Sequence, residues 1–406
     1  MTPGPFFAIN RRAADPGGRP DAEEPMGAGQ RYDVIVVGMG GMGSAAAYQL
    51  ARRGKRVLGL ERFDIGHSMG SSHGVNRIIR LAYFEHPDYV PLLRHAYRLW
   101  RETEQAHGEQ LLFITGSIDA GPRGSRVAAG SLASCIAHGL EHEELTAGEL
   151  ARRFPGWRLP DGYSAVYQAE GGFVASERAI LAHVWLALRH GAEIRAREPV
   201  LDWSTTAEGV CVRTPQGTYH AERLVLSAGA WMGEMVPALA GKAVPERQVI
   251  GWFWPKDPEL FALDRFPVGN LLTEHGHFYV FPQWGMPGFK IGLYHHFNET
   301  GAADDLPREA TARDEEALRT GIRHYFPAAD GPVMSLRGCL FTNTPDEHFV
   351  IDTLPGDPRV VVASPCSGHG FKFASAIGDI LADLACGARP AFDLDLFKLD
   401  RLGKAA

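Results

Sequence analysis

The chain has 406 residues, 45% of them apolar, which is enough to bury a sizeable core and indicates two domains. The formal net charge is -7 and the sequence has no basic stripe, so a nucleic-acid partner is excluded. No apolar stretch reaches the length that spans a membrane, and the five cysteines lack Cys-x-x-Cys spacing, which favours neither a disulfide framework nor a zinc site. We therefore expect a cytoplasmic protein that binds neither a metal nor a membrane.

The first segment, residues 1–30, is rich in glycine, proline, alanine and charge. It contains no apolar run of the kind that a secretory signal needs, and nothing in it can form a packed core. We predict a disordered extension here.

A glycine motif follows this extension. Residues 34–37 form an uninterrupted apolar run, which is typical of a buried parallel strand. Gly38, Gly40 and Gly43 come next in the pattern Gly-x-Gly-x-x-Gly, in which the glycines permit a tight turn, close approach to a pyrophosphate, and close packing of helix and strand. Residues 44–53 are good helix formers, so the helix N-terminus would face the phosphates.

A second apolar strand, 56–60, ends on Glu61. A carboxylate at this point of the motif binds a ribose hydroxyl and repels a 2'-phosphate. Strand, glycines, helix, strand and acid in this order predict a dinucleotide site. The alternative is a glycine turn that is purely structural.

The rest of the chain alternates between helices and strands. This order indicates that the chain passes from the nucleotide-binding domain into a second domain and then back into the first. We expect helices at about 84–105 and at 145–154, and a third over 177–190 with Ser176 as its N-cap. Three apolar segments read as strands of an antiparallel sheet that forms the floor of a substrate cavity: 249–254, 277–281 and 289–294.

The chain resembles the monomeric sarcosine oxidase and N-methyltryptophan oxidase family of flavin amine oxidases, from Tyr32 onward. The resemblance rests on the glycine motif and on four later blocks, which occur in the family's order. These blocks are 70–80 (GSSHGVNRIIR), 289–292 (FKIG), 339–348 (CLFTNTPDEH) and 367–373 (SGHGFKF).

The resemblance implies FAD as the cofactor and an α/β (α+β) fold, in which an antiparallel-sheet substrate domain is inserted into a Rossmann-type FAD-binding domain. We expect the FAD-binding domain to comprise 31–105, 166–235 and 331–406. We expect the substrate domain to comprise 106–165 and 236–330.

The family pattern also assigns roles to cofactor-binding residues. Cys339 matches the cysteine whose sulfur is joined covalently to the flavin, and a buried structural cysteine is the alternative. Gly368 and Gly370 match a segment that offers backbone amides to the flavin ring. Cys366 falls where the family has an apolar residue, and we assign it to packing.

Two cations, Arg80 and Lys372, match the pair that holds the substrate carboxylate, the arginine as a bidentate fork and the lysine as a point charge. Lys290 and Arg77 match charged residues beside the flavin, where the lysine promotes reaction with O2. A lysine that snorkels from a strand edge is the alternative for Lys290.

His73 and Tyr279 match further active-site positions, and a hydrogen-bonded core histidine is the alternative for His73. Two departures concern the substrate end of the site. Phe341 stands where sarcosine oxidases have tyrosine, and Tyr294 stands where they have histidine, unless one inserted residue restores a histidine at position 295.

The resemblance therefore implies an FAD-dependent oxidase of N-methyl or cyclic secondary amino acids that forms an imine and hydrogen peroxide. We expect a monomer that acts on a small-molecule amine and O2, with bulky N-methyl amino acids favoured over sarcosine. A dehydrogenase or imino-acid desaturase on the same fold is the nearest alternative. A flavin-binding protein without catalysis is a remote one.

Overall fold

The computed structural model describes residues 31–364 and 367–403, so the predicted extension 1–30 and Cys366 lie outside the described residues. The chain divides into two units, Met1–Arg31 and Tyr32–Ala406, and the following description concerns the second. Within the described part of the chain, no helix is both long enough and apolar enough to cross a membrane.

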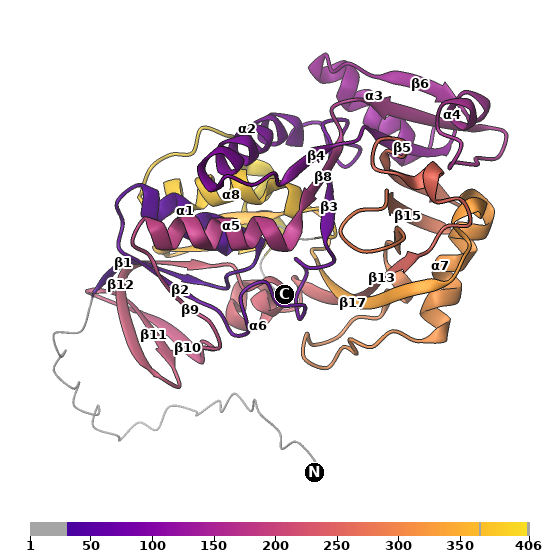
Figure 1. Cartoon of the computed structure of the whole chain (residues 1–406). Coiled ribbons are helices and arrows are strands. Elements are labelled where there is room, and N and C mark those ends of the chain that lie inside the picture. Colours follow the sequence, from indigo (N-terminus) through magenta and orange to yellow (C-terminus); the bar gives the residue numbers. More distant parts are fainter. Residues whose placement is uncertain (1–30, 365–366, 404–406) are drawn as a thin grey trace, which may run out of the picture. The chain divides into compact units, whose positions relative to one another are not determined.

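The first sheet has a parallel centre, in which β1 lies between β12 and β2 (Figure 1). Strand β9 continues the parallel order beyond β2, and β19 pairs in parallel with the end of β12. Antiparallel strands β10, β11 and β18 complete the sheet. Its strands are β1 (Tyr32–Val37), β2 (Val57–Leu60), β9 (Glu193–Arg195), β10 (Asp202–Thr206), β11 (Gly209–Thr214), β12 (Gly217–Leu226), β18 (Val350–Leu354) and β19 (Asp357–Ser364).

Helix α1 (Gly41–Arg52) follows β1 and packs between α5 (Ser176–Arg189) and α8 (Ala374–Ala385) (Figure 1). Helix α2 (Tyr89–His107) packs on α8 and confirms the helix predicted at about 84–105. The short helix predicted at 145–154 is α4 (Ala147–Arg153).

The predicted cap of α5 is wrong. Ser176 is the first residue of the helix and Ala175 is its N-cap, without a side-chain cap. The Ser176 hydroxyl instead donates to the Glu177 carboxylate at 2.6 Å. That carboxylate also accepts from the backbone N–H groups of Gly74 and Val75, so the start of α5 holds the 70–80 segment.

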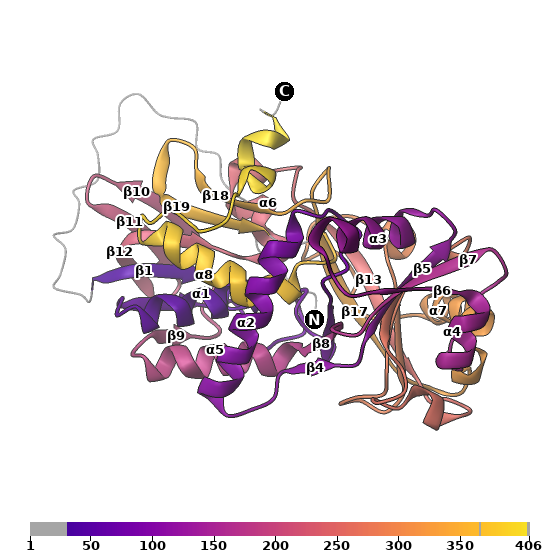
Figure 2. The ribbon, with the colours of Figure 1, turned by 90° about the horizontal axis from the view of Figure 1, so that it is seen from above.

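The second sheet has eight strands in the order β17-β13-β16-β15-β14-β5-β7-β6 (Figures 1 and 2). All neighbours are antiparallel except β14 and β5, which confirms the antiparallel sheet predicted from the three apolar segments. Strand β17 lies within 331–406, which was expected in the FAD-binding domain, and the structure places it in this second sheet. The strands are β5 (Ser117–Pro122), β6 (Glu143–Thr146), β7 (Tyr163–Gln168), β13 (Val244–Phe253), β14 (Val268–Thr273), β15 (Gly276–Phe281), β16 (Phe289–Leu293) and β17 (Val333–Asn343).

The two faces of this sheet differ because side chains alternate along each strand. One face packs on α7 (Ala312–Tyr325) through Phe278, Val280, Phe289 and Ile291. Residues directly opposite each other on neighbouring strands share a face, so the pairs Tyr279 with Gly292 and Trp252 with Lys290 lie together on the other one. This second face, called the site face below, carries His277, Tyr279, Lys290 and Cys339.

A small third sheet of β3 (Asn76–Ile79), β8 (Gly172–Ala175) and β4 (Leu112–Ile114) adjoins the site face. Contacts at this junction include the Lys290 ammonium with the Asn76 carbonyl, the Arg77 guanidinium with Cys339, and Phe173 of β8 in one cluster with Phe281 of β15. Helix α3 (Arg126–His138) packs on β5 and β7 at the other end of the second sheet.

Candidate active site

The glycine turn fits a dinucleotide. A Cβ at Gly43 would lie 1.7 Å from the Gly38 carbonyl oxygen, and one at Gly38, where φ is +86°, would lie 2.6 Å from the Ser227 oxygen. Packing therefore requires both glycines. A Cβ at Gly40 would meet, among the described residues, only the Ser72 hydroxyl at 3.7 Å. Gly40 thus leaves open space at the N-terminus of α1, where a helix favours a phosphate.

Glu61 lies beside this turn and is buried. One carboxylate oxygen accepts from the Met39 N–H at 2.8 Å, and the other accepts from the Phe63 N–H at 2.9 Å. Because a carboxylate has about four acceptor positions, the held group can still bind a ribose hydroxyl.

Cys339 lies on the site face in β17 and is 3% exposed. Its Sγ is 3.6 Å from Nη2 of Arg77, which also donates to the Ser71 carbonyl at 2.9 Å. The cysteine sulfur thus lies beside the positive charge of Arg77.

Lys290 is buried, and its Nζ donates to three oxygens: the Gly74 carbonyl at 2.7 Å, and the Asn76 carbonyl and side-chain oxygen at 2.8 Å each. The Nζ is also 4.0 Å from the centre of the Phe281 ring. Burial lowers the pKa of Lys290. Three acceptors match the three donors of an ammonium group, however, and this coordination favours the charged form.

His73 is buried, and neither of its ring nitrogens has a hydrogen-bond partner among the described residues. Burial, with a contribution from the Arg77 charge, lowers the pKa of His73 to about 3, so the ring is neutral. A neutral imidazole with unused donor and acceptor positions fits a site that is completed by a cofactor.

Tyr279 reaches across the neighbouring strand because the opposite residue is Gly292. A Cβ at Gly292 would lie 2.1 Å from the Tyr279 ring, so any other residue would displace it. The Tyr294 ring lies 5.2 Å from the Tyr279 ring and 5.5 Å from the Phe341 ring. The structure therefore places a tyrosine here, while the His295 imidazole points to Glu246 at 2.9 Å.

Arg80 is 1% exposed and is held by two carboxylates. Its Nη2 donates to Glu85 at 2.9 Å, and its Nε lies 3.2 Å from Asp119. Burial alone would lower the pKa of Arg80, but the Asp119 and Glu85 charges keep it above its usual value. The Nη1 atom is buried without a hydrogen-bond partner among the described residues, which leaves donors for a further anion.

Lys372 lies near the same Tyr83 ring as Arg80. Its Nζ is 5.2 Å from the ring centre, and the Arg80 guanidinium carbon is 4.6 Å from it. The Nζ donates to the His369 carbonyl at 2.6 Å, and burial lowers the pKa of Lys372 to about 7. The structure thus brings the two predicted carboxylate-binding residues together.

The segment around Gly368 and Gly370 touches the strand that carries Cys339. The Ser367 N–H donates to the Thr342 carbonyl at 2.9 Å. Gly368 has φ +77°, and a Cβ there would lie 2.5 Å from the Phe341 ring. Backbone of this segment consequently passes close to the site face.

Sequence reasoning missed Asp119, Asn270 and Glu85, although all three organise Arg80. The Asp119 carboxylate accepts from the Asn270 amide at 2.7 Å and from the Ser131 hydroxyl at 2.5 Å. The available signal was a lone charge between apolar residues of a buried strand, because such a charge needs a partner. The position of Asn270 beside Asp119 follows from the pairing of β5 with β14 and could not be read from the sequence.

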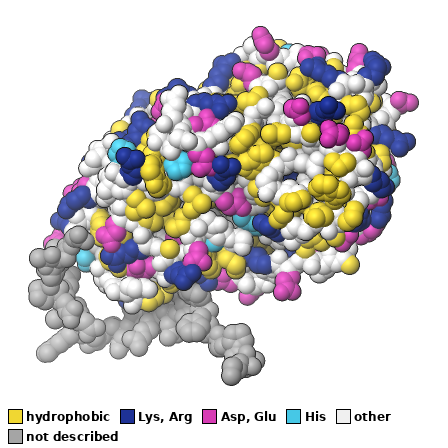
Figure 3. Space-filling model, in the orientation of Figure 1, with side chains coloured by type: hydrophobic (Ala, Val, Ile, Leu, Met, Phe, Trp, Pro, Cys, Tyr) yellow, Lys and Arg dark blue, Asp and Glu magenta, His cyan; other side chains and the backbone are white. Residues whose placement is uncertain are grey.

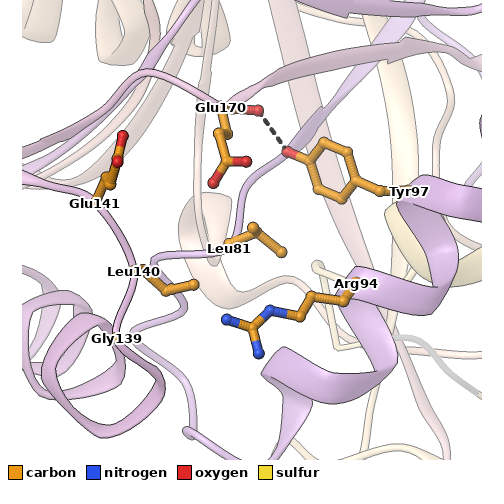
Figure 4. A pocket seen from close by; sticks show the side chains of 7 residues that line it. All are labelled: Leu81, Arg94, Tyr97, Gly139, Leu140, Glu141 and Glu170. Atoms are coloured by element: carbon orange, nitrogen blue, oxygen red, sulfur yellow. Dashed lines mark hydrogen bonds between the residues drawn. The ribbon is translucent and has the colours of Figure 1, made fainter.

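A surface pocket of about 500 Å³ opens beside Leu81, the neighbour of Arg80 (Figure 4). Figure 4 shows Arg94 and Tyr97 of α2 facing Glu141 and Glu170, and the Tyr97 hydroxyl donates to the Glu170 carbonyl at 2.8 Å. None of its lining residues belongs to the site face, so we assign this pocket no part in the chemistry.

Comparison with known proteins agrees with this geometry. A family model described as FAD dependent oxidoreductase matches residues 33–384. The chain is 39% identical over 387 residues to monomeric sarcosine oxidase of Streptomyces avermitilis, covering 92% of this chain and 98% of the relative. It is 36% identical over 377 residues to N-methyl-L-tryptophan oxidase of Salmonella typhi, covering 92% and 100%.

Among solved structures, NikD, an unusual amino acid oxidase essential for nikkomycin biosynthesis, has a TM-score of 0.80 and 28% identity, covering 91% of this chain and 97% of NikD. L-Proline dehydrogenase from P. horikoshii has a TM-score of 0.78 at 19% identity, covering 92% and 98%, and this likeness concerns the fold alone. The chain belongs to the family of FAD-dependent oxidoreductases, as the resemblance carried by its glycine motif and the four later blocks implied.

Proposed function

We propose that the protein is an FAD-dependent oxidase that converts the C–N bond of an N-methyl or cyclic secondary amino acid to an imine and reduces O2 to hydrogen peroxide. The observation that carries this proposal is the pair of buried basic side chains, Arg80 and Lys372, that both lie near the Tyr83 ring. Buried cations with unused donors bind a carboxylate strongly. The relatives that are sarcosine and N-methyl-L-tryptophan oxidases support the same reaction.

The residues of the glycine turn fit FAD: Gly40 and the α1 N-terminus would hold the pyrophosphate, and Glu61 the ribose. We propose that Cys339 is the point of covalent attachment, because it lies buried on the site face and its sulfur is 3.6 Å from Nη2 of Arg77. Gly368 and Gly370 would offer backbone amides to the ring. When bound, FAD accepts a hydride equivalent from the carbon next to nitrogen and passes two electrons to O2.

The protein side chains supply binding and charge. Arg80 and Lys372 would fix the substrate carboxylate, which orients the neutral amine and keeps its reacting carbon in one place. Lys290 would hold a positive charge close to the site of oxygen reduction, where preorganised charge stabilises developing negative charge. His73 and Tyr279 would line the site, and the imine product would hydrolyse after release.

We propose that residues 31–105, 166–235 and 331–406 bind the cofactor and that residues 106–165 and 236–330 bind the substrate. We also propose that the protein is a cytoplasmic monomer. The sarcosine oxidase relatives are named monomeric sarcosine oxidase, which supports the proposal of a monomer.

A dehydrogenase that passes electrons to a carrier is the second candidate, and one observation favours it. Burial lowers the pKa of Lys290, and a neutral lysine would not assist oxygen reduction. An oxygen electrode with peroxide detection separates the two candidates when N-methyl amino acids are supplied. We expect one peroxide for each O2 consumed. Oxidation that proceeds only with an added electron carrier would establish the dehydrogenase.

Lys290→Met sharpens this test. If the ammonium group assists oxygen reduction, the variant should reoxidise with O2 about a hundredfold or more slower, the size of effect that one preorganised group has. Amine oxidation under anaerobic conditions should change much less. The exposed Lys256→Met is the matched control, and unchanged reoxidation in Lys290→Met would make Lys290 a structural residue.

A further inference from the structure

His277 is a buried histidine on the site face with no role in the chemistry described so far. It lies in β15, two residues before Tyr279, so both side chains leave the same face of the strand. The residue is 6% exposed, and neither Nδ1 nor Nε2 has a hydrogen-bond partner among the described residues. A buried polar group without a partner destabilises a protein, and such groups in native structures normally bind a water or a ligand.

The protonation state of His277 defines what it can bind. Burial lowers the pKa of this imidazole to about 3, and the Arg126 charge acts in the same direction. The ring is therefore neutral at physiological pH, with one N–H donor and one nitrogen acceptor. It suits a neutral polar group, such as a hydroxyl or an amide.

The neighbours of His277 place it beside the carboxylate-binding residues. Its ring stacks on Tyr294 at 4.4 Å between ring centres, and lies 5.5 Å from Phe84. The Phe84 ring is in turn 4.4 Å from the Arg80 guanidinium carbon. On its other side, the Tyr294 ring approaches Phe341. The side chain of a substrate whose carboxylate reaches Arg80 would consequently meet a wall of three aromatic rings and one unpartnered imidazole.

We propose that His277 determines substrate specificity by forming a hydrogen bond to a polar group on the side chain of the substrate amino acid. This inference rests on the proposed function. The preferred substrate class is an N-methyl amino acid whose side chain combines an apolar or aromatic body with a hydroxyl or amide. The three aromatic rings contact the apolar or aromatic part of the side chain, and His277 forms a hydrogen bond to its hydroxyl or amide. A purely apolar side chain would leave both imidazole nitrogens without partners.

The test uses two matched ligand pairs on the FAD-loaded enzyme without oxygen: N-methylphenylalanine with N-methyltyrosine, and N-methylleucine with N-methylasparagine. Within each pair the shape is similar, and the members differ in a polar group. Apparent dissociation constants come from the dependence of the flavin reduction rate on ligand concentration in anaerobic stopped flow. We expect the polar member of at least one pair to bind about tenfold tighter, as one buried hydrogen bond implies.

His277→Phe should abolish this preference, because phenylalanine keeps the stacking on Tyr294 and removes both nitrogens. His275→Phe, two residues earlier in the turn before β15, is the control and should keep it. If His277→Phe does not fold, His277→Gln serves, and it should retain part of the preference because its amide still donates and accepts.

The outcomes separate this inference from the function on which it rests. Equal affinity of the wild type within both pairs, or a preference that persists in His277→Phe, would overturn the role of His277 and leave the oxidase assignment intact. If none of the four ligands, nor any other N-methyl amino acid, perturbs the flavin spectrum, the proposed function fails and the inference fails with it.

Discussion

Arg80 shows how a single buried charge can be both paired and available. Glu85 and Asp119 neutralise it, yet Nη1 keeps its donors. A charged hydrogen bond contributes about 1.5 to 3 kcal/mol, so Arg80→Met and Lys372→Met should each weaken binding of an amino-acid substrate by about one to two decades. The dependence of the anaerobic flavin reduction rate on substrate concentration measures this loss.

The control for these two variants is a matched amine without a carboxylate, which should bind poorly to the wild type and lose little more in either variant. Arg265→Met, a change at an exposed arginine, should leave both affinities as they are. If the wild type bound the two ligands equally well, the carboxylate contact would play no part in recognition.

Cys339 gives a second prediction at the scale of one residue. If its sulfur carries the cofactor, FAD should stay with the polypeptide after acid precipitation, and Cys339→Ala should release it. Cys211→Ala, at a half-buried cysteine of β11, is the control and should retain the flavin. Absorbance at the flavin bands of pellet and supernatant measures the outcome, and free FAD from the wild type would contradict covalent attachment.

The site residues differ in whether the sequence could predict them. The predicted pair Arg80 and Lys372 belongs to two recognisable blocks, and the structure brings its members near one ring. The structure also brings Arg77 to Cys339, a contact that was not predicted. Asp119 and Asn270 were not predicted. They lie side by side because β5 pairs in parallel with β14, and no local sequence pattern indicates that these two distant segments pair. The Ser176 cap failed because the helix begins at Ser176, one residue earlier than predicted, so that Ala175 occupies the N-cap position.

The glycine turn between β1 and α1 is the element whose geometry the sequence predicted best, because its pattern is local. Gly43→Ala would push a Cβ to 1.7 Å from the Gly38 oxygen, so it should destabilise the apoprotein by about 1 to 3 kcal/mol or more. Gly40→Ala meets no such obstacle in the described structure. It should leave the melting temperature of the apoprotein unchanged and lower the FAD bound per polypeptide.

These two variants form a matched pair, and both readouts are needed. A Gly40→Ala protein with full FAD content would show that the pyrophosphate lies elsewhere. A Gly43→Ala protein as stable as the wild type would contradict the close contact between turn and helix.

Two loops next to the site are joined by an ion pair that depends on pH. His295 follows β16 and lies 2.9 Å from Glu246 and 3.3 Å from Glu347, which follows β17. Hydrogen bonds to these carboxylates raise the pKa of His295 from 6.5 to about 9. The folded state therefore binds the proton more tightly, so this stabilisation is complete below pH 6.5 and is lost as the pH rises through 9.

Denaturant unfolding of the wild type and His295→Gln across this pH range measures the effect. We expect the difference in free energy of unfolding to be largest at about pH 6 and to shrink towards pH 10. His142→Gln, which removes a histidine bonded only to a backbone carbonyl in the described structure, should show no such trend. A difference that is constant with pH would mean that the ion pair contributes nothing.

At the scale of the whole molecule, the site forms where separate sheets meet. The parallel sheet supplies the glycine turn and Glu61, the small sheet supplies Arg77, and the second sheet supplies Lys290 and Cys339 (Figure 1). A local pattern predicted the glycine turn and Glu61, and the family resemblance supplied Arg77, Lys290 and Cys339 and their grouping. Physical reasoning from the sequence alone could not, because contacts such as Lys290 with Asn76 join segments more than two hundred residues apart.

The surface adds one property that composition did not predict. Figure 3 shows apolar side chains interspersed with charges of both signs over the face in view. Helix α5 exposes Leu181, Trp185 and Leu188 at helical spacing. Isolated exposed apolar residues are normal on soluble folds, and nothing in the described structure indicates a partner for this stripe.

The central claim is that an N-methyl or cyclic secondary amino acid delivers its electrons to FAD in this protein. The most direct measurement is anaerobic mixing of the purified holoenzyme with a panel of such amino acids, followed by absorbance of the flavin. We predict full bleaching at one equivalent of a good substrate, and recovery of the oxidised spectrum with one equivalent of hydrogen peroxide when O2 is admitted. A flavin that stays oxidised with every member of the panel would contradict the account.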